Sequence, residues 1–77
     1  MKDLLSYIIE NITGNSEFDI IVSESETGMV DFTIKIDKDH IGIIIGKEGR
    51  TIKSIRNLLK VRAVIENKAV NINIEEK

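Results

Sequence analysis

The sequence predicts an α+β domain in which helices cover one face of a three-stranded mixed sheet, in the order α-β-β-α-α-β. Three observations support this fold class. Residues 30–36 alternate strictly between apolar and polar side chains, which is the pattern of a strand with one buried face. Residues 2–13 and 50–65 instead repeat apolar side chains at helical spacing. A long helical crossover separates the second predicted strand from the third, so those two strands should be parallel.

The first predicted element is a helix from Lys2 to about Thr13. It should stop at Gly14-Asn15, because both residues tolerate a left-handed backbone. Tyr7 falls off the apolar stripe of this helix and should border it. The stripe itself consists of Leu4, Leu5, Ile8, Ile9 and Ile12.

A β-hairpin should follow this helix. Its first strand places Phe18, Ile20 and Val22 on one face. Residues 26–28 form the predicted turn, and residues 30–36 form the second strand. Because the connecting loop is short, the two strands should be antiparallel.

Two helices and one strand complete the predicted fold. Asp37 or Asp39 can cap a short helix that ends near Ile45. A longer helix spans about residues 50–65, and residues 70–75 alternate as the last strand. The chain contains no repeat or linker, so we expect a single domain over its 77 residues.

The composition restricts the class of function. The chain has no cysteine and one histidine, which excludes disulfides and leaves no Cys/His spacing for zinc. Its net charge of −2 hides an asymmetry, because residues 1–37 hold two basic and eight acidic residues, whereas residues 38–77 hold nine basic and five acidic ones. Within residues 47–62 there are six basic residues and one acid. A local cationic patch of this kind can attract a polyanion despite the acidic whole chain.

The sequence also argues against an enzyme, a cofactor and a membrane span. His40 has no Cys, His or Ser partner at a useful spacing and should be an exposed first-turn residue. The stretch from Gly42 to Lys47 differs from a Walker loop, because three residues separate its glycines and Glu48 follows the lysine. No apolar run approaches the roughly 20 residues that cross a bilayer, and the acidic N-terminus differs from a secretory signal. We therefore expect a cytoplasmic, non-catalytic protein.

The residues that can carry chemistry lie in and after the segment 46–49. At 100° per residue, Arg50, Lys53, Arg56 and Lys60 share one face of the long helix. The adjoining, buried face should hold Ile52, Ile55, Leu58 and Leu59. Gly46 and Gly49 permit a close backbone approach, the helix N-terminus presents amides, and Lys47 adds a mobile charge. Such a surface can hold a sugar–phosphate backbone. A solvated helix face after a plain turn is the alternative interpretation.

The flanking pattern Ile-Gly-x-x-Ile-Gly-x-x-Gly-x-x-Ile-x-x-Ile resembles the core of K-homology (KH) domains. In this sequence it is filled by Ile41, Gly42, Ile45, Gly46, Gly49, Ile52 and Ile55. In that family a GXXG loop joins two helices and clamps about four single-stranded nucleotides. The α-β-β elements ahead of the motif resemble the type II arrangement, and almost the whole chain resembles the small stand-alone bacterial KH proteins of the KhpA family.

The resemblance implies a role for each matching residue. Gly46, Lys47, Glu48 and Gly49 would clamp the RNA backbone, and Gly42 would let the short helix pack closely at the groove. Ile41, Ile44 and Ile45 would supply groove wall or core, with Ile45, Ile52 and Ile55 favoured as core. The predicted RNA-binding set is Gly42, Ile44, Ile45, Gly46, Lys47, Glu48, Gly49, Arg50, Lys53 and Arg56. Glu48 departs from the basic or neutral residues common at its position, so it should weaken phosphate binding or instead cap the following helix.

The resemblance also implies a function and partners. The chain would bind single-stranded RNA as a chaperone or post-transcriptional regulator, without metal or cofactor. It would act with a larger multi-domain KH protein (KhpB, or Jag) or as a homodimer. The alternative is a KH-like protein-interaction module, which the acidic first half and Glu48 would favour.

Overall fold

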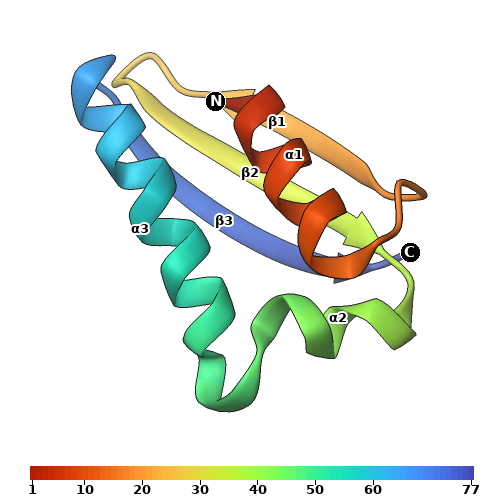
Figure 1. The fold of residues 1–77 in the computed structure, drawn as a ribbon. Helices are drawn as coiled ribbons and strands as arrows, with labels where there is room; N and C mark the ends of the chain where they lie inside the picture. Colours follow the sequence, from red (N-terminus) through yellow and green to blue (C-terminus); the bar gives the residue numbers. More distant parts are fainter.

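Figure 1 shows the helices lying against one face of a three-stranded sheet in the computed structural model, which describes residues 1–77. The α+β class and the order α-β-β-α-α-β are confirmed. The elements are α1 (Lys2–Thr13), β1 (Asp19–Glu24), β2 (Met29–Ile36), α2 (Lys38–Ile45), the short 3₁₀ turn η1 (Lys47–Gly49), α3 (Arg50–Ile65) and β3 (Ala69–Glu76).

The sheet has the strand order β1-β2-β3, with β2 in the centre. β1 and β2 are antiparallel and place Val22 opposite Phe32. β2 and β3 are parallel and place Phe32 opposite Ile72, which confirms the predicted directions of the strands. The crossover through α2, η1 and α3 brings the chain back to the end of the sheet at which β2 begins, as a parallel connection requires.

The core lies between the central strand and the helices. β2 buries every second side chain from Val30 to Ile36, each at most 3% exposed, as the strict alternation predicts. Two turns of α1 cover this face through Leu5 and Ile9, which are fully buried. The edge strand β1 is covered less well, because Val22 remains 43% exposed. The buried side chains are Leu5, Ile9, Val30, Phe32, Ile34, Ile36, Ile44, Ile55, Leu59, Ala63 and Ile72.

The prediction that Ile45 and Leu58 belong to the core is wrong. Ile45 is 38% exposed, whereas its neighbour Ile44 is fully buried. Leu58 is 55% exposed, whereas its neighbour Leu59 is fully buried. Neighbouring residues in a helix point about 100° apart, so a helix that packs on one side buries only one of each pair. In α3 that side is the line through Ile55, Leu59 and Ala63.

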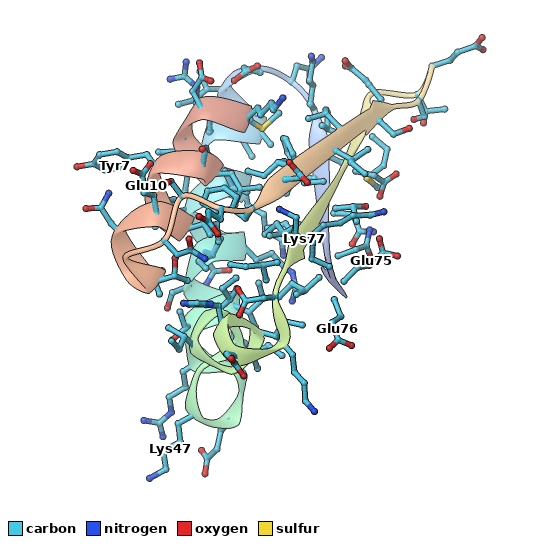
Figure 2. The ribbon with its side chains drawn as sticks, turned by 90° about the vertical axis from the view of Figure 1, so that its right-hand side faces the viewer. Tyr7, Glu10, Lys47, Glu75, Glu76 and Lys77 are labelled. Atoms are coloured by element: carbon cyan, nitrogen blue, oxygen red, sulfur yellow. The ribbon has the colours of Figure 1, made fainter.

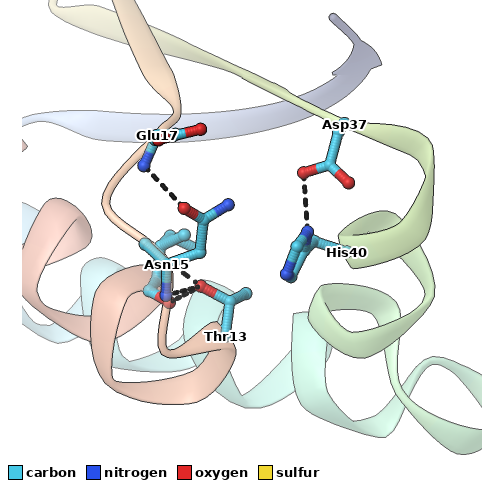
Figure 3. A network of polar contacts seen from close by, with 6 residues as sticks. Thr13, Asn15, Glu17, Asp37 and His40 are labelled. Atoms are coloured by element: carbon cyan, nitrogen blue, oxygen red, sulfur yellow. Dashed lines mark hydrogen bonds and ion pairs between the residues drawn. The ribbon is translucent and has the colours of Figure 1, made fainter.

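Side chains after α1 organise the turn into β1. Gly14 is left-handed at φ 68°, as the predicted stop requires. The Thr13 hydroxyl donates to the carbonyl oxygen of Ile9 at 2.8 Å and accepts the amide of Asn15 at 3.2 Å (Figure 3). The Asn15 side-chain oxygen then accepts the Glu17 amide at 2.8 Å. These hydrogen bonds fix the short loop between α1 and β1.

The start of α2 is held by a side-chain pair. Asp37 is the residue at the N-cap, but its side chain makes no cap hydrogen bond. Its Oδ1 instead lies 2.6 Å from Nδ1 of His40 (Figure 3). The His40 side chain is 29% exposed, so the histidine expected to be exposed is in fact partly buried, in the first turn as predicted. This pair lies within the first turn of α2, at the end opposite to the glycine segment.

Candidate nucleic-acid interface

Gly46 ends α2 in a conformation that only glycine adopts without strain. Its φ of 76° and ψ of 175° lie in a region that is essentially closed to side-chain-bearing residues. A Cβ added at this position would overlap the Thr51 hydroxyl and would lie 2.6 Å from Cβ and 2.9 Å from the backbone nitrogen of the same residue. Both backbone geometry and space therefore require glycine here.

Glu48 and Gly49 continue the turn with two consecutive left-handed residues. Their φ values are 57° and 74°, and the amide of Gly49 donates to the carbonyl oxygen of Gly46 at 3.2 Å. The first turn of α3 has no side-chain cap, so the expected capping by Glu48 does not occur. Its Oε2 instead lies 3.5 Å from Nη2 of Arg50, and both side chains are mostly exposed. This acid already has a cation beside it, which reduces its repulsion of an incoming phosphate.

The basic residues of the loop and of α3 differ in whether they have a carboxylate partner. Lys47, Lys53, Arg56 and Lys60 form no ion pair. Lys53, Arg56 and Lys60, here called the α3 cations, are spaced by three and four residues and so share one helix face. Figure 2 shows Lys47 projecting from the loop away from the body of the molecule. Lys47 and the α3 cations are therefore free to meet an outside anion, whereas Arg50 next to the loop already has Glu48 at 3.5 Å.

The other basic residues near the end of α3 are paired. The Arg62 Nε lies 3.0 Å from Oε2 of Glu66. The Lys68 Nζ lies 2.8 Å from Oε1 of Glu24. The hydrogen bond and the charge of Glu24 raise the pKa of Lys68 above its ordinary value of 10.5. This pair joins the turn between α3 and β3 to the last residue of β1, far along the chain from the loop, and serves the fold.

The outer side of α2 is open. A Cβ added to Gly42 would meet nothing within 4 Å, so the close packing predicted for this glycine is not made within the chain. Ile43 and Ile45 are 46% and 38% exposed on the same short helix. Ile44 is fully buried, so among the predicted groove residues it supports the site from the core. The predicted RNA-binding set omits Ile43. Residues 43–45 are all isoleucine, so the sequence does not indicate which of them is exposed.

The arrangement suits an extended ligand more than a small molecule. The two hollows of the surface lie elsewhere, one of them lined by Tyr7, Glu10, Asn11 and Gly14 in and just after α1. Figure 2 shows Tyr7 and Glu10 on α1, away from Lys47 and the loop. No three His, Cys, Asp or Glu side chains are close enough together to hold a metal ion. None of the helices combines the length and the apolar character that a membrane crossing requires. The site consists of an exposed loop with the unpaired Lys47, the unpaired α3 cations, the Glu48–Arg50 pair and two partly exposed isoleucines.

Comparison with known families gives a match over nearly the full chain. The family model described as KhpA/KhpB, KH domain, matches residues 2–74. A protein of Chlamydia caviae named RNA-binding protein KhpA is 43% identical over 76 residues, which cover 99% of this chain and 97% of that protein. A protein of the same name from Thermotoga maritima is 37% identical over 59 residues, or 77% of this chain and 79% of that protein.

Comparison with solved structures supports the fold. The crystal structure of Aquifex aeolicus Era matches with a TM-score of 0.57 over 96% of this chain, at 19% sequence identity. The chain spans 30% of the length of that protein. At this identity the likeness concerns the fold alone.

Proposed function

Since the chain belongs to the KhpA/KhpB KH-domain family, we propose that it is a non-catalytic, single-stranded RNA-binding protein of the cytoplasm. A single KH domain over residues 1–77 clamps the RNA backbone at the loop 46–49 and acts as an RNA chaperone or post-transcriptional regulator. The resemblance to relatives named RNA-binding protein KhpA supports the ligand.

The observation that carries the clamp is the distribution of unpaired charge. Lys47 and the α3 cations have no carboxylate partner, whereas Arg62 and Lys68 are neutralised within the fold. Cations left free beside a glycine loop gain most from a phosphate, because no internal ion pair has to be broken. The open position at Gly42 and the exposed faces of Ile43 and Ile45 leave room for the nucleotides beside the backbone.

The same surface predicts modest affinity and low sequence selectivity. It has no Phe, Tyr or Trp on the loop, on α2 or on α3 to stack a base, and the imidazole of His40 at the far end of α2 is paired with Asp37. Backbone contacts therefore supply most of the binding energy, and these contacts do not depend on sequence. A second clamp, in a larger multi-domain KH protein (KhpB, or Jag) or in a second copy, would raise the avidity without new contacts.

The test separates the loop from the fold. Replacing Lys47 and Glu48 together by aspartate keeps both glycines, and aspartate tolerates the left-handed conformation at position 48. We expect binding to a short labelled single-stranded RNA, followed by fluorescence anisotropy, to fall at least about tenfold, because two acids then face the phosphates. The thermal midpoint should change little, since both side chains are exposed.

The matched control is Lys2→Asp, which brings a comparable change of charge to an exposed residue of α1. It should leave RNA binding close to that of the parent. If the double aspartate variant is folded and binds RNA like the parent, the loop is only a turn. The protein-interaction hypothesis then replaces the RNA clamp.

A further inference from the structure

The outer edge of β1 is a strand edge that no other part of the chain pairs with. β1 bonds to β2 on one side only, because the strand order is β1-β2-β3. Just beyond β1, the amide of Ser25 donates to the carbonyl oxygen of Met29 at 2.9 Å. Bonded and non-bonded pairs alternate along an antiparallel ladder, so the odd-numbered residues of β1 bond to β2. Ile20, Val22 and Glu24 therefore turn their N–H and C=O groups to the open edge, where no turn or loop bonds to them.

This edge lacks the features that usually protect an edge strand. Proline, lysine, a bulge or a covering loop commonly prevents an exposed edge from pairing with another chain. β1 contains no proline or lysine, and its register with β2 is unbroken from Asp19 to Glu24. These two acids stand at its ends and are paired with Lys77 at 3.6 Å and with Lys68 at 2.8 Å. Residues 20–23 between them are uncharged, so the middle of the strand is open to a further strand.

β1 also presents apolar side chains on both faces of the sheet. Successive side chains of a strand point to opposite faces, and here Ile21 and Val22 are 48% and 43% exposed. Val22 borders a hollow of ≈ 140 Å³ that Val30 and Phe32 also line. Small-molecule sites measure roughly 300–1,000 Å³, so this hollow suits a single apolar side chain. A strand added at the edge would cover Ile21, Val22 and the hollow together.

We propose that the outer edge of β1 binds an extended segment of another protein, which adds a fourth strand to the sheet. The segment alternates apolar residues with polar ones and carries Lys or Arg near its ends. In binding of this kind, main-chain hydrogen bonds supply the affinity and alternate side chains supply the selectivity. The inference goes beyond the proposed function and does not depend on it, because the edge shares no residue with the loop or with the α3 cations.

The charges beyond the ends of β1 determine the class of partner. Glu17 and Glu26 lie two residues before and two residues after the strand, are exposed and form no ion pair. They repel the phosphates of RNA and attract a strand with basic ends. They also disfavour a second copy of this chain. An antiparallel pair of β1 strands would bring Glu17 of one copy towards Glu26 of the other, and a parallel pair would align each acid with its own kind.

The probe for the test is a fluorescein-labelled peptide of alternating valine and threonine with two lysines at each end, and its binding is followed by anisotropy. The decisive variant is Val22→Pro. Proline removes an outward N–H here and leaves the ladder with β2, and it is tolerated where the N–H of an edge strand faces solvent. The dissociation constant of the peptide should rise at least about tenfold, because a donor is lost and the ring lies where the added strand would sit. The matched control Val22→Thr keeps the donor and should bind about as tightly as the parent.

The flanking acids are tested by a second pair of variants. Glu17→Gln combined with Glu26→Gln should weaken peptide binding and make it depend less on salt. Glu75→Gln combined with Glu76→Gln makes the same change of charge at the end of β3, the other edge strand (Figure 2), and should leave peptide binding nearly unchanged. A peptide with glutamates in place of its lysines should not bind.

Hydrogen exchange in the parent protein tests the proposal even if Val22→Pro does not fold. The amides of Ile20, Val22 and Glu24 should exchange more slowly when the peptide is bound. The proposal is overturned if the parent does not bind the peptide, if a folded Val22→Pro protein binds it like the parent, or if these amides gain no protection. Protection that appears without peptide and grows with protein concentration assigns the edge to a second copy and equally overturns it. The double aspartate loop variant should lose RNA and still bind the peptide, so the two proposals fail separately.

Discussion

Substitution of Gly46 by alanine should destabilise the protein more than the same change at either neighbouring glycine. The backbone at this position, with φ 76° and ψ 175°, costs a residue with a side chain about 1–3 kcal/mol. The added Cβ also overlaps Thr51, including its backbone nitrogen at 2.9 Å, and such overpacking costs about 1–3 kcal/mol. We expect a total of about 3 kcal/mol. For a domain of this size that lowers the thermal midpoint by roughly 12–24 °C.

Two glycines of the same segment provide the controls. Gly49 is also left-handed at φ 74°, but an added Cβ meets nothing within 4 Å, so alanine should cost only about 1 kcal/mol of strain. Gly42 lies within α2, has no positive φ and is equally unobstructed, so alanine should stabilise the helix by about 0.5–1 kcal/mol.

Urea and thermal unfolding followed by circular dichroism measure the three differences. The order of stability should be Gly42→Ala, then the parent, then Gly49→Ala, then Gly46→Ala. Adding Thr51→Ala to Gly46→Ala should recover part of the loss, because it removes the side-chain overlap and leaves the backbone strain. A Gly46→Ala protein within about 0.5 kcal/mol of the parent would refute the argument from loop geometry.

Three further outcomes are expected. If about three phosphates are bound, raising the salt concentration from about 50 to 200 mM should weaken RNA binding on the order of twentyfold in anisotropy titrations. Lys53→Ala should make the affinity depend less on salt, whereas Lys35→Ala should leave this dependence unchanged. Replacing Glu48 by glycine should raise the thermal midpoint slightly and tighten RNA binding, because it relieves a left-handed backbone and removes an acid; weaker binding would show that the acid helps the clamp. Because the pKa of Lys68 is raised in the folded protein, its pair with Glu24 stabilises the fold fully below pH 10.5, and this stabilisation is lost as the pH rises through the higher pKa of the folded state. The difference in thermal midpoint between the parent and Lys68→Met should therefore become smaller at alkaline pH.

Much of the fold follows from local pattern. The period of two in residues 30–36 predicts β2 and its buried side, and the structure buries Val30, Phe32, Ile34 and Ile36 as expected. Helices α1 and α2 end where glycine supplies a positive φ, at Gly14 and Gly46. These signals are reliable because they depend on side-chain chemistry and backbone freedom within a few residues.

Some features of the candidate site can be predicted from the sequence, and others depend on the tertiary structure. The glycine spacing and the basic residues after it are visible in the chain, and this pattern is enough to place the loop and the cations. Whether those cations are free is not visible, because Arg62 and Lys68 look like Lys53 in the sequence. Pairing of Lys68 with Glu24 brings together residues more than 40 positions apart, and only the fold decides such contacts.

The order of the elements, the directions of the strands, the position of the loop and the local excess of positive charge all follow from the chain alone. Which of two adjacent apolar residues is buried depends instead on tertiary packing, which selects Ile44 over Ile45 and Leu59 over Leu58. The same packing leaves an apolar side of α3 in water. Hydrophobicity belongs to a residue, whereas burial depends on the direction in which a helix packs, and that direction is set by the sheet beneath it.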